Sequence, residues 1–423
     1  MLKNWGLPDD NSAYMKKMRN RTAGLVLIGL LIAGSTPQAQ TQEAPPDSAR
    51  AIPILGPVRA LWVVRDALTS KASIQKVVED AAAGGITDLL VQVRGRGDAY
   101  FPSEQAPVAP NLQAAWRNQG DFDPLALITR EAHARGLRVH AWLNVYLVWS
   151  KGSPPRGHVV EQHPEWVAIN ANGIGMDALP FRKMEAAGTE GVYLEPGNCD
   201  VVRHFLGIVD EILVRYPVDG IHLDYVRYPR MNVGYSEAMR AGFIRKTGLD
   251  PLELDSRRDR YEREYGPERV ADLDREWHQF KADQVTALVR NVRALMNSRK
   301  PSLVLSAAVR PDPDEALYVF GQDWVQWVNQ GWVDAVAPMM YSPSPSTVAR
   351  QTNEALRRVP ANRIWAGMAI YNQSVNDAAA KIRDARLKGI DGFAIFSYNA
   401  LSGGARDLRK LTSSAAMVRG DSR

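Results

Sequence analysis

The sequence predicts an α/β fold, a TIM-type (β/α)8 barrel with long insertions in its βα loops. Three observations favour this class. Short apolar runs alternate with amphipathic stretches along the chain. Several amphipathic stretches close with a glycine, which suits the C-terminus of a helix. The strand–helix unit recurs until eight strands are reached, as a parallel barrel requires. A doubly wound open sheet is the alternative that shares this alternation.

The expected strands are short runs rich in Val, Leu, Ile and aromatic residues, which are typical of buried parallel strands. They cover Arg59–Val64, Thr87–Arg94, Leu137–Asn144, Val218–Tyr225, Leu303–Val309, Val333–Tyr341, Ile364–Tyr371 and Gly392–Tyr398. Helix patterns lie between them, for example at 73–85, 124–136 and 378–389. Two long connections follow strands, at 146–191 and 230–276. In a barrel both would lie at the C-terminal face, where active sites are built. The charged part of the second is expected to be a solvated helical insertion.

The N-terminal segment has the pattern of a secretory signal peptide. The cationic residues Lys16, Lys17, Arg19 and Arg21 precede the apolar run Ala23–Gly34, which is too short for the ~20 residues that span a bilayer. Ala33 and Ser35 offer small residues for cleavage, and no cysteine follows the run closely. We therefore expect a signal peptide at 1–35, a flexible leader at 36–57, a barrel at 58–402 and a C-terminal helix or tail at 403–423. The mature protein is expected to be periplasmic or secreted, with no stable membrane anchor.

Composition argues against several other classes of protein. The chain has 423 residues, 45% of them hydrophobic, and a net charge of +5. Because the first 35 residues carry +3 of this charge, the remainder is only weakly basic, and we expect no nucleic-acid partner. A single cysteine, Cys199, excludes an internal disulfide. Since no metal-binding, phosphate-binding or dinucleotide-binding motif is found, we expect neither a metal nor a cofactor.

Alternation along the strands places polar side chains inside the predicted barrel. In Val218–Tyr225, Ile221 and Leu223 face outward, so that His222 and Asp224 point inward. The same parity turns His140, Trp142 and Asn144 inward on the third strand, and Gln92 and Arg94 on the second. Each buried polar group costs free energy unless it is paired, so this concentration predicts a site. A structural network between the strands remains the alternative, above all for His222, His140 and Gln92.

Several motifs in a fixed order resemble a known family. They include V-Q-V-R-G-R-G-D-A-Y-F-P-S, H-A-W-L-N-V-Y, H-P-E-W, L-E-P-G-N, D-G-I-H-L-D-Y-V-R-Y-P and A-P-M-M-Y. From about Arg59 to about Leu401 the chain is similar to the glycosyl-hydrolase-like family, described as glycoside hydrolase family 10-like, of exported bacterial envelope proteins. The resemblance implies a TIM barrel that acts on an envelope glycan, with peptidoglycan as the leading substrate class. It also implies importance for Arg94, Arg96, Asp98, Asn144, Asp224, Tyr225, Arg227 and Tyr228.

A weaker resemblance links D-G-I-H-L-D-Y-V to the chitinase-type strand D-x-x-D-x-D-x-E. Val226 stands at the place of the catalytic glutamate of that motif. Because valine cannot protonate a leaving group, the chitinase-type mechanism does not transfer to this chain.

Hydrolysis of a glycosidic bond usually needs two carboxyl groups, one as acid and one as nucleophile or base. Asp224 is predicted to be the nucleophile or base, kept ionised by Arg227 or Arg94. The acid is sought first at Glu195 or Asp98, with Glu104, Asp312 and Asp314 as further candidates. Residues expected to bind the glycan are Arg94, Arg96, His140, Trp142, Asn144, His222, Tyr225, Arg227, Tyr228 and Tyr341. A barrel that binds glycan without cleaving it, or a hydrolase of an exopolysaccharide, is the alternative function.

Overall fold

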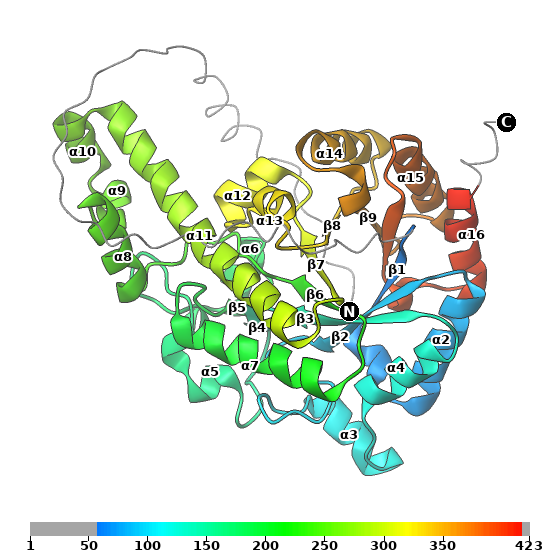
Figure 1. The fold of residues 1–423 in the computed structure, drawn as a ribbon. Coiled ribbons are helices and arrows are strands. Elements are labelled where there is room, and N and C mark those ends of the chain that lie inside the picture. The colour runs from blue at the N-terminus through cyan, green and yellow to red at the C-terminus, as the bar shows by residue number, and fades with distance from the viewer. Residues whose placement is uncertain (1–56, 417–423) are drawn as a thin grey trace. The chain divides into compact units, whose positions relative to one another are not determined.

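The structure, a computed structural model, describes residues 57–416 and contains a parallel barrel (Figure 1). The predicted signal peptide, nearly all of the predicted leader and the last residues of the predicted tail lie outside the described residues. Each predicted strand run contains one barrel strand, so the predicted fold class is confirmed. The strands are β1 (Arg59–Val63), β2 (Asp88–Arg94), β3 (Arg138–Asn144), β6 (Gly220–Asp224), β7 (Val304–Val309), β8 (Ala335–Pro338), β9 (Trp365–Ala369) and β10 (Gly392–Phe396).

The barrel strands are neighbours in the order in which they follow one another along the chain. Every pairing in the sheet is parallel, from β8 through β7, β6, β3, β2, β1 and β10 to β9. The two edge strands meet through isolated parallel bridges that join Val336 to Ile364 and Met339 to Gly367. The sheet therefore closes almost completely into a barrel, as repeated right-handed βα units require.

Helices surround the barrel, and their ends follow the capping rules. Ser70 caps the helix that begins with Lys71 by accepting a hydrogen bond from the Ser73 amide, and Asp123 caps a helix that begins with Pro124. The surrounding helices are α2 (Lys71–Ala83), α3 (Pro110–Gln119), α4 (Pro124–His133), α7 (Cys199–Arg215), α11 (Pro267–Arg299), α12 (Pro313–Phe320), α13 (Trp324–Asn329), α14 (Pro345–Arg358), α15 (Val375–Leu387) and α16 (Ala405–Ala416). Among the described residues, no helix combines the length and apolarity needed to cross a membrane.

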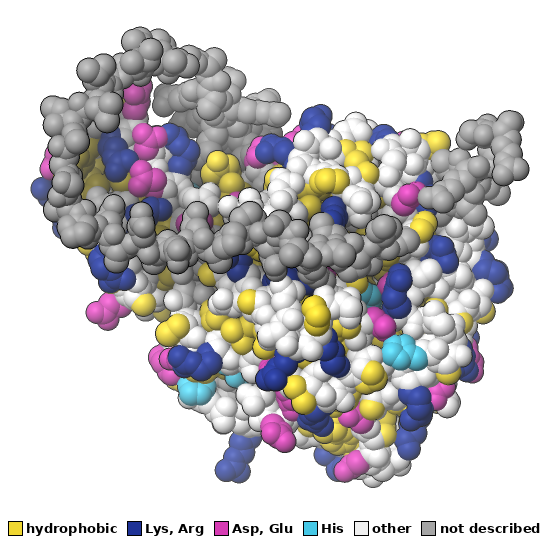
Figure 2. Space-filling view, in the orientation of Figure 1, with side chains coloured by type: hydrophobic (Ala, Val, Ile, Leu, Met, Phe, Trp, Pro, Cys, Tyr) yellow, Lys and Arg dark blue, Asp and Glu magenta, His cyan; other side chains and the backbone are white. Residues whose placement is uncertain are grey.

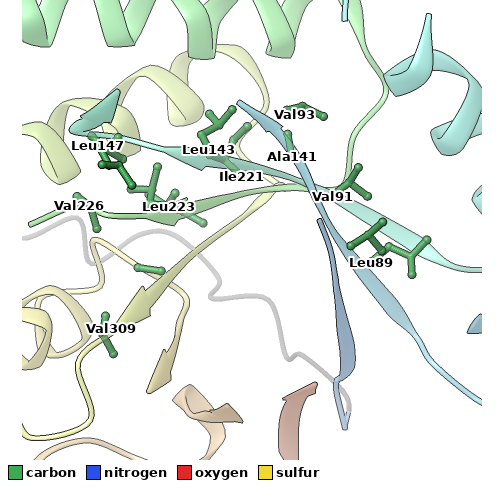
Figure 3. Close-up of a cluster of buried hydrophobic side chains, with 14 of the residues drawn as sticks. Leu89, Val91, Val93, Ala141, Leu143, Leu147, Ile221, Leu223, Val226 and Val309 are labelled. Atoms are coloured by element: carbon green, nitrogen blue, oxygen red, sulfur yellow. The ribbon is translucent and has the colours of Figure 1, made fainter. Parts of the chain in front are cut away.

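Strand alternation divides the core into two layers, as the sequence predicts. Outward side chains of β2, β3 and β6, such as Leu89, Val91, Leu143 and Leu223, belong to the large apolar cluster between strands and helices (Figure 3). A second cluster fills the barrel itself and consists of Val58, Ala60, Trp62, Leu90, Trp142, Val304, Ala308, Ala335, Ala337, Trp365 and Ala394. Because the two clusters take alternate residues along β1, β2, β3 and β7–β10, the inward positions are fixed by the pleat.

Two insertions follow β3 and β6. The first contains β4 (Leu147–Trp149), α5 (Val159–Gln162), α6 (Phe181–Ala186) and β5 (Val192–Tyr193), with β4 and β5 paired antiparallel. The second contains α8 (Glu237–Thr247), α9 (Pro251–Ser256), α10 (Arg258–Tyr265) and the first half of α11. It has a small core of its own, formed by Tyr235, Met239, Phe243, Leu254, Leu273 and Trp277. The second half of α11 packs on the barrel, so this one helix joins the insertion to the main core.

Candidate active site

Asp224 is the last residue of β6 and lies opposite Asn144 of β3 in the parallel register. The next residue, Tyr225, has a φ of 49°, a left-handed conformation that non-glycine residues rarely adopt. Such strained positions cluster at functional sites, because the surrounding structure must hold them in place. The chain therefore turns sharply where Asp224 leaves the core, at the C-terminal face of the barrel.

The Asp224 carboxylate is almost fully buried, with 7% of the residue exposed. Its Oδ2 accepts a hydrogen bond of 3.1 Å from the indole N–H of Trp142, and its Oδ1 accepts one of 2.7 Å from the Tyr225 amide. Burial raises the pKa of Asp224 to about 6, although these hydrogen bonds and the charge of Arg227 oppose the shift. A carboxyl group with a pKa near neutrality can exchange protons with a substrate at physiological pH.

Aromatic rings surround this end of the barrel. Tyr341 stacks on Phe396 with ring centroids 5.3 Å apart, and both rings contact Trp62 edge to face. Trp142 meets Phe396 in the same way, at 6.4 Å. The negative charge of Asp224 contributes to the raised pKa of Tyr341, whose main cause is burial, so the tyrosine and the carboxylate are close enough to interact. Tyr341 and Phe396 are only partly buried, and such rings can cover the apolar face of a sugar.

Arg227 pairs with a carboxylate that the sequence analysis did not select. Its Nη2 lies 2.8 Å from Glu190 Oε1, and the same carboxylate accepts a hydrogen bond from the Tyr193 hydroxyl. Burial alone would raise the pKa of Glu190, but Arg227 and Tyr193 hold it below its usual value. The charge of Glu190 also raises the pKa of Asp224. Glu190 lies in the first insertion, where no strand periodicity marks it. Its position five residues before Glu195, a predicted site residue, is a signal in the sequence that could have pointed to it.

Glu195 contacts a different set of groups. Its Oε1 accepts a hydrogen bond of 2.8 Å from the Tyr228 hydroxyl, while its buried Oε2 has no hydrogen-bond partner. Burial raises the pKa of this carboxyl, partly offset by the Tyr228 bond and the charge of Lys281. Glu195 therefore supports the loop after β6 through Tyr228, and no hydrogen bond joins its carboxyl to that of Asp224.

The R-G-R-G-D turn, residues 94–98, is joined to the end of β3 by hydrogen bonds. Arg94 is fully buried and donates hydrogen bonds to the backbone carbonyls of Asn144 and Val145. Asn144 in turn donates to the carbonyl of Gly95 at 2.7 Å and accepts from Gln92. Asp98 accepts a hydrogen bond from the Arg96 amide, which closes the turn. Arg94 therefore positions the end of β3 through its Nη1, while its buried Nε has no hydrogen-bond partner. Its contact with substrate stays a prediction.

Asp98 and Arg96, the other two charged residues of the R-G-R-G-D turn, also have partners within the protein. Asp98 is 1% exposed, and its carboxylate is engaged in the turn, so it is poorly placed to protonate a leaving group. The side chain of Arg96 donates to Ser150 at 3.3 Å and lies over the ring of Trp149. Arg96 therefore joins the turn after β2 to the first insertion.

The two inward histidines are buried in the barrel. His140 pairs with Asp88, the first residue of β2, at 2.9 Å, so it lies toward the N-terminal end of the strands, away from Asp224. His222 accepts from the Trp62 indole at 3.1 Å and contacts Ser306, and burial lowers its pKa to about 3. Both are 0% exposed. These partners fit the structural network between strands that is the alternative for both histidines, and their contact with substrate stays a prediction.

Other features add nothing to the chemistry of this face. Within residues 57–416, no group of three His, Cys, Asp or Glu residues is arranged to hold a metal ion. A depression of about 570 Å³ opens between α4 and the end of α7, and no predicted site residue lines it. Its lining residues are Asp123, Ala126, Arg130, His133, Arg215, Tyr216 and Pro217. Val226 is fully buried in the apolar core, so no acid stands at the position that a chitinase-type strand would use.

Comparison with known proteins agrees with this architecture. The family model described as glycosyl hydrolase-like 10 matches residues 56–382. The chain belongs to this family. Its curated relatives include the glycosyl hydrolase DigH of Escherichia coli, which is 25% identical over 387 residues, or 80% of this chain and 76% of DigH. The glycosyl hydrolase YngK of Bacillus subtilis is 23% identical over 314 residues, or 69% of this chain. The chain aligns with about half, 54%, of the length of YngK.

Solved structures with the same fold include glycoside hydrolases. The glycoside hydrolase domain of PgaB from Bordetella bronchiseptica matches with a TM-score of 0.63 and 13% identity, over 84% of this chain and 99% of that domain. The catalytic domain of the β-amylase from Paenibacillus polymyxa matches with a TM-score of 0.55 and 11% identity, over 84% of this chain and 98% of that domain. At these identities the likeness shows the fold alone. The predicted resemblance to the glycosyl hydrolase-like 10 family is confirmed by the family match.

Proposed function

We propose that the protein is an exported glycoside hydrolase that cleaves O-glycosidic bonds in a bacterial envelope glycan, with peptidoglycan strands as its substrate. The observation that carries the proposal is the buried Asp224 carboxyl, with a pKa of about 6, at the C-terminal end of a barrel strand among aromatic rings. Membership of a glycosyl hydrolase-like family supports the reaction class. The signal-peptide pattern of residues 1–35 supports export to the periplasm or beyond.

Asp224 has the properties that this chemistry needs. At pH 7 most of the Asp224 carboxyl groups are ionised and can act as nucleophile or base, while a protonated fraction remains available below pH 6. The N–H groups of Trp142 and Tyr225 hold the two carboxylate oxygens in fixed directions. Tyr341 offers a partly exposed ring to a sugar bound beside the carboxylate.

A barrel that binds glycan without cleaving it is the second candidate, and one observation favours it. Glycoside hydrolysis usually uses a second carboxyl group as acid or base. Glu190, which acts electrostatically on Asp224, is held in an ion pair with Arg227, and its pKa is lowered. An ionised carboxylate is a poor proton donor. On this candidate, Arg227 and the aromatic rings would bind the glycan, and Asp224 would accept hydrogen bonds from its hydroxyls.

Digestion of purified peptidoglycan sacculi separates the two candidates. The wild-type protein is expected to release soluble fragments whose masses identify the cleaved bond. The Asp224→Asn variant should release at least about 100-fold less while remaining folded. Asp210→Asn is the matched control, because Asp210 is a partly exposed residue of α7 that pairs with Arg299. A folded wild type that releases no fragments and still sediments with sacculi would favour the binding function.

A further inference from the structure

Three arginines converge on one phenylalanine ring beside the candidate active site. The guanidinium carbons of Arg310, Arg227 and Arg230 lie 4.8, 5.0 and 5.4 Å from the centroid of the Phe320 ring. Arg227 and Arg230 follow β6, Arg310 follows β7, and Phe320 ends α12. We call Arg227, Arg230 and Arg310 the arginine cluster. Its members come from the loops after two neighbouring strands, at the C-terminal face of the barrel.

Two carboxylates accompany the arginine cluster and leave it with a surplus of positive charge. Glu190 pairs with Arg227 at 2.8 Å. Glu315 bridges the other two arginines, at 2.7 Å from Arg230 and 3.4 Å from Arg310. Three guanidinium groups therefore face two carboxylates. Burial lowers the pKa of Arg310, the charge of Glu315 raises it, and the charges of Arg227 and Arg230 lower it, so these two cations repel Arg310.

The arginine cluster also has unused hydrogen-bond donors. The Nε–H groups of Arg227 and Arg310 are buried and have no hydrogen-bond partner. An unpaired buried donor costs free energy, and this cost is removed when an acceptor arrives. The side chains of Arg230 and Arg310 keep 27% and 14% of their surface exposed, so a ligand can approach the cluster from solvent. Arg227 connects the cluster to the candidate active site, because its positive charge lowers the pKa of Asp224.

We propose that the arginine cluster is a subsite that binds a carboxylate carried by a sugar of the glycan, such as the lactyl carboxylate of a muramic acid residue. This inference rests on the proposed function, since it names the class of glycan bound at the same face. Each arginine fork in the cluster already holds a carboxylate of the protein, so the geometry suits that group. One incoming carboxylate would balance three cations with three anions. The subsite thus selects acidic glycans over neutral ones such as chitin.

Binding to the full-length Asp224→Asn variant tests the subsite independently of cleavage. The probes are glycan strands with free muramic acid carboxylates and the same strands after reduction of those carboxylates to alcohols. Calorimetry should show the native strands binding about tenfold or more tightly than the reduced strands. Adding Arg230→Gln, a partly exposed substitution, should remove most of this preference. Adding Arg299→Gln, at the opposite end of the barrel on α11, should leave it unchanged.

The outcomes separate this inference from the proposed function. Equal affinity of Asp224→Asn for native and reduced strands, including no binding of either, would overturn the subsite. A preference for native strands that survives Arg230→Gln and also Arg310→Gln would overturn it as well. Failure of the wild type to cleave both sacculi and the glycan strands with free muramic acid carboxylates would instead contradict the hydrolase function, and the carboxylate preference would still be measurable.

Discussion

The indole N–H of Trp142 donates a hydrogen bond of 3.1 Å to Asp224, and the two residues lie on adjacent barrel strands. Trp142 is two residues before the end of β3, while Asp224 ends β6, so the bond joins two inward positions at different levels. An N–H donor stabilises the ionised carboxylate, whereas burial destabilises it. The pKa of about 6 is the balance of these effects, and each can be changed separately.

Trp142→Phe should move the acidic limb of the pH–activity profile upward. The substitution keeps an aromatic ring inside the barrel but removes the donor to the ionised form of Asp224. The pKa of Asp224 should therefore rise, by roughly one unit. Activity measured between pH 4 and pH 8 would show the shift, with Trp332→Phe, which lies outside the barrel beside Arg290, as control. An unmoved acidic limb would mean that Asp224 does not set it.

Glu190→Gln should move the same limb in the opposite direction. The negative charge of Glu190 raises the pKa of Asp224, and it also neutralises Arg227. Glutamine preserves the shape but removes the charge, so the free charge of Arg227 should favour ionised Asp224. The same pH series applied to this variant checks the direction. A shift upward, as in Trp142→Phe, would show that Glu190 acts through structure and not through charge.

The sequence predicts which strand residues point inward because side chains alternate strictly along a strand. The pairs Asp88–His140 and Trp62–His222 follow that parity. Alternation gives the face of a residue but not its level along the barrel axis, which depends on the register between strands. For that reason His140 is predicted at the site together with Asp224, although it lies near the N-terminal ends of the strands.

Partners contributed by the first insertion and by α12 are harder to predict from the sequence. Glu190 and Glu315 become neighbours of the β6 loop only after the chain has folded, and no periodic pattern marks either residue. Glu195 stands in a motif that resembles the family, but motif position does not show which groups its carboxyl meets. Charges are also distributed over much of the visible surface of the barrel, so an exposed carboxylate alone identifies nothing (Figure 2).

Arg94→Lys should lower the free energy of unfolding by about 1–3 kcal/mol. Arg94 is buried, and its Nη1 donates to the carbonyls of both Asn144 and Val145. Lysine carries its ammonium group one bond nearer to the backbone, so it cannot take the same position. Turnover should fall as well, because the end of β3 positions Asn144 opposite Asp224. Urea denaturation and activity would be compared with those of the control Arg299→Lys. The side chain of Arg299 is exposed at the end of α11, where it pairs with Asp210 of α7. A variant of unchanged stability with reduced turnover would instead indicate that Arg94 contacts the substrate directly.

Asp224→Asn should change how stability depends on pH. Burial raises the pKa of Asp224 from its ordinary 3.8 to about 6, so the folded protein binds this proton more tightly than the unfolded chain does. The resulting stabilisation is complete below the unfolded pKa and is lost as the pH rises through 6. Between pH 4 and pH 8, the wild type should therefore lose up to about 3 kcal/mol relative to the variant. Urea denaturation of both proteins across this range measures the difference. If the difference stays constant while the variant still loses activity, Asp224 would be ionised throughout and its pKa would be an ordinary one.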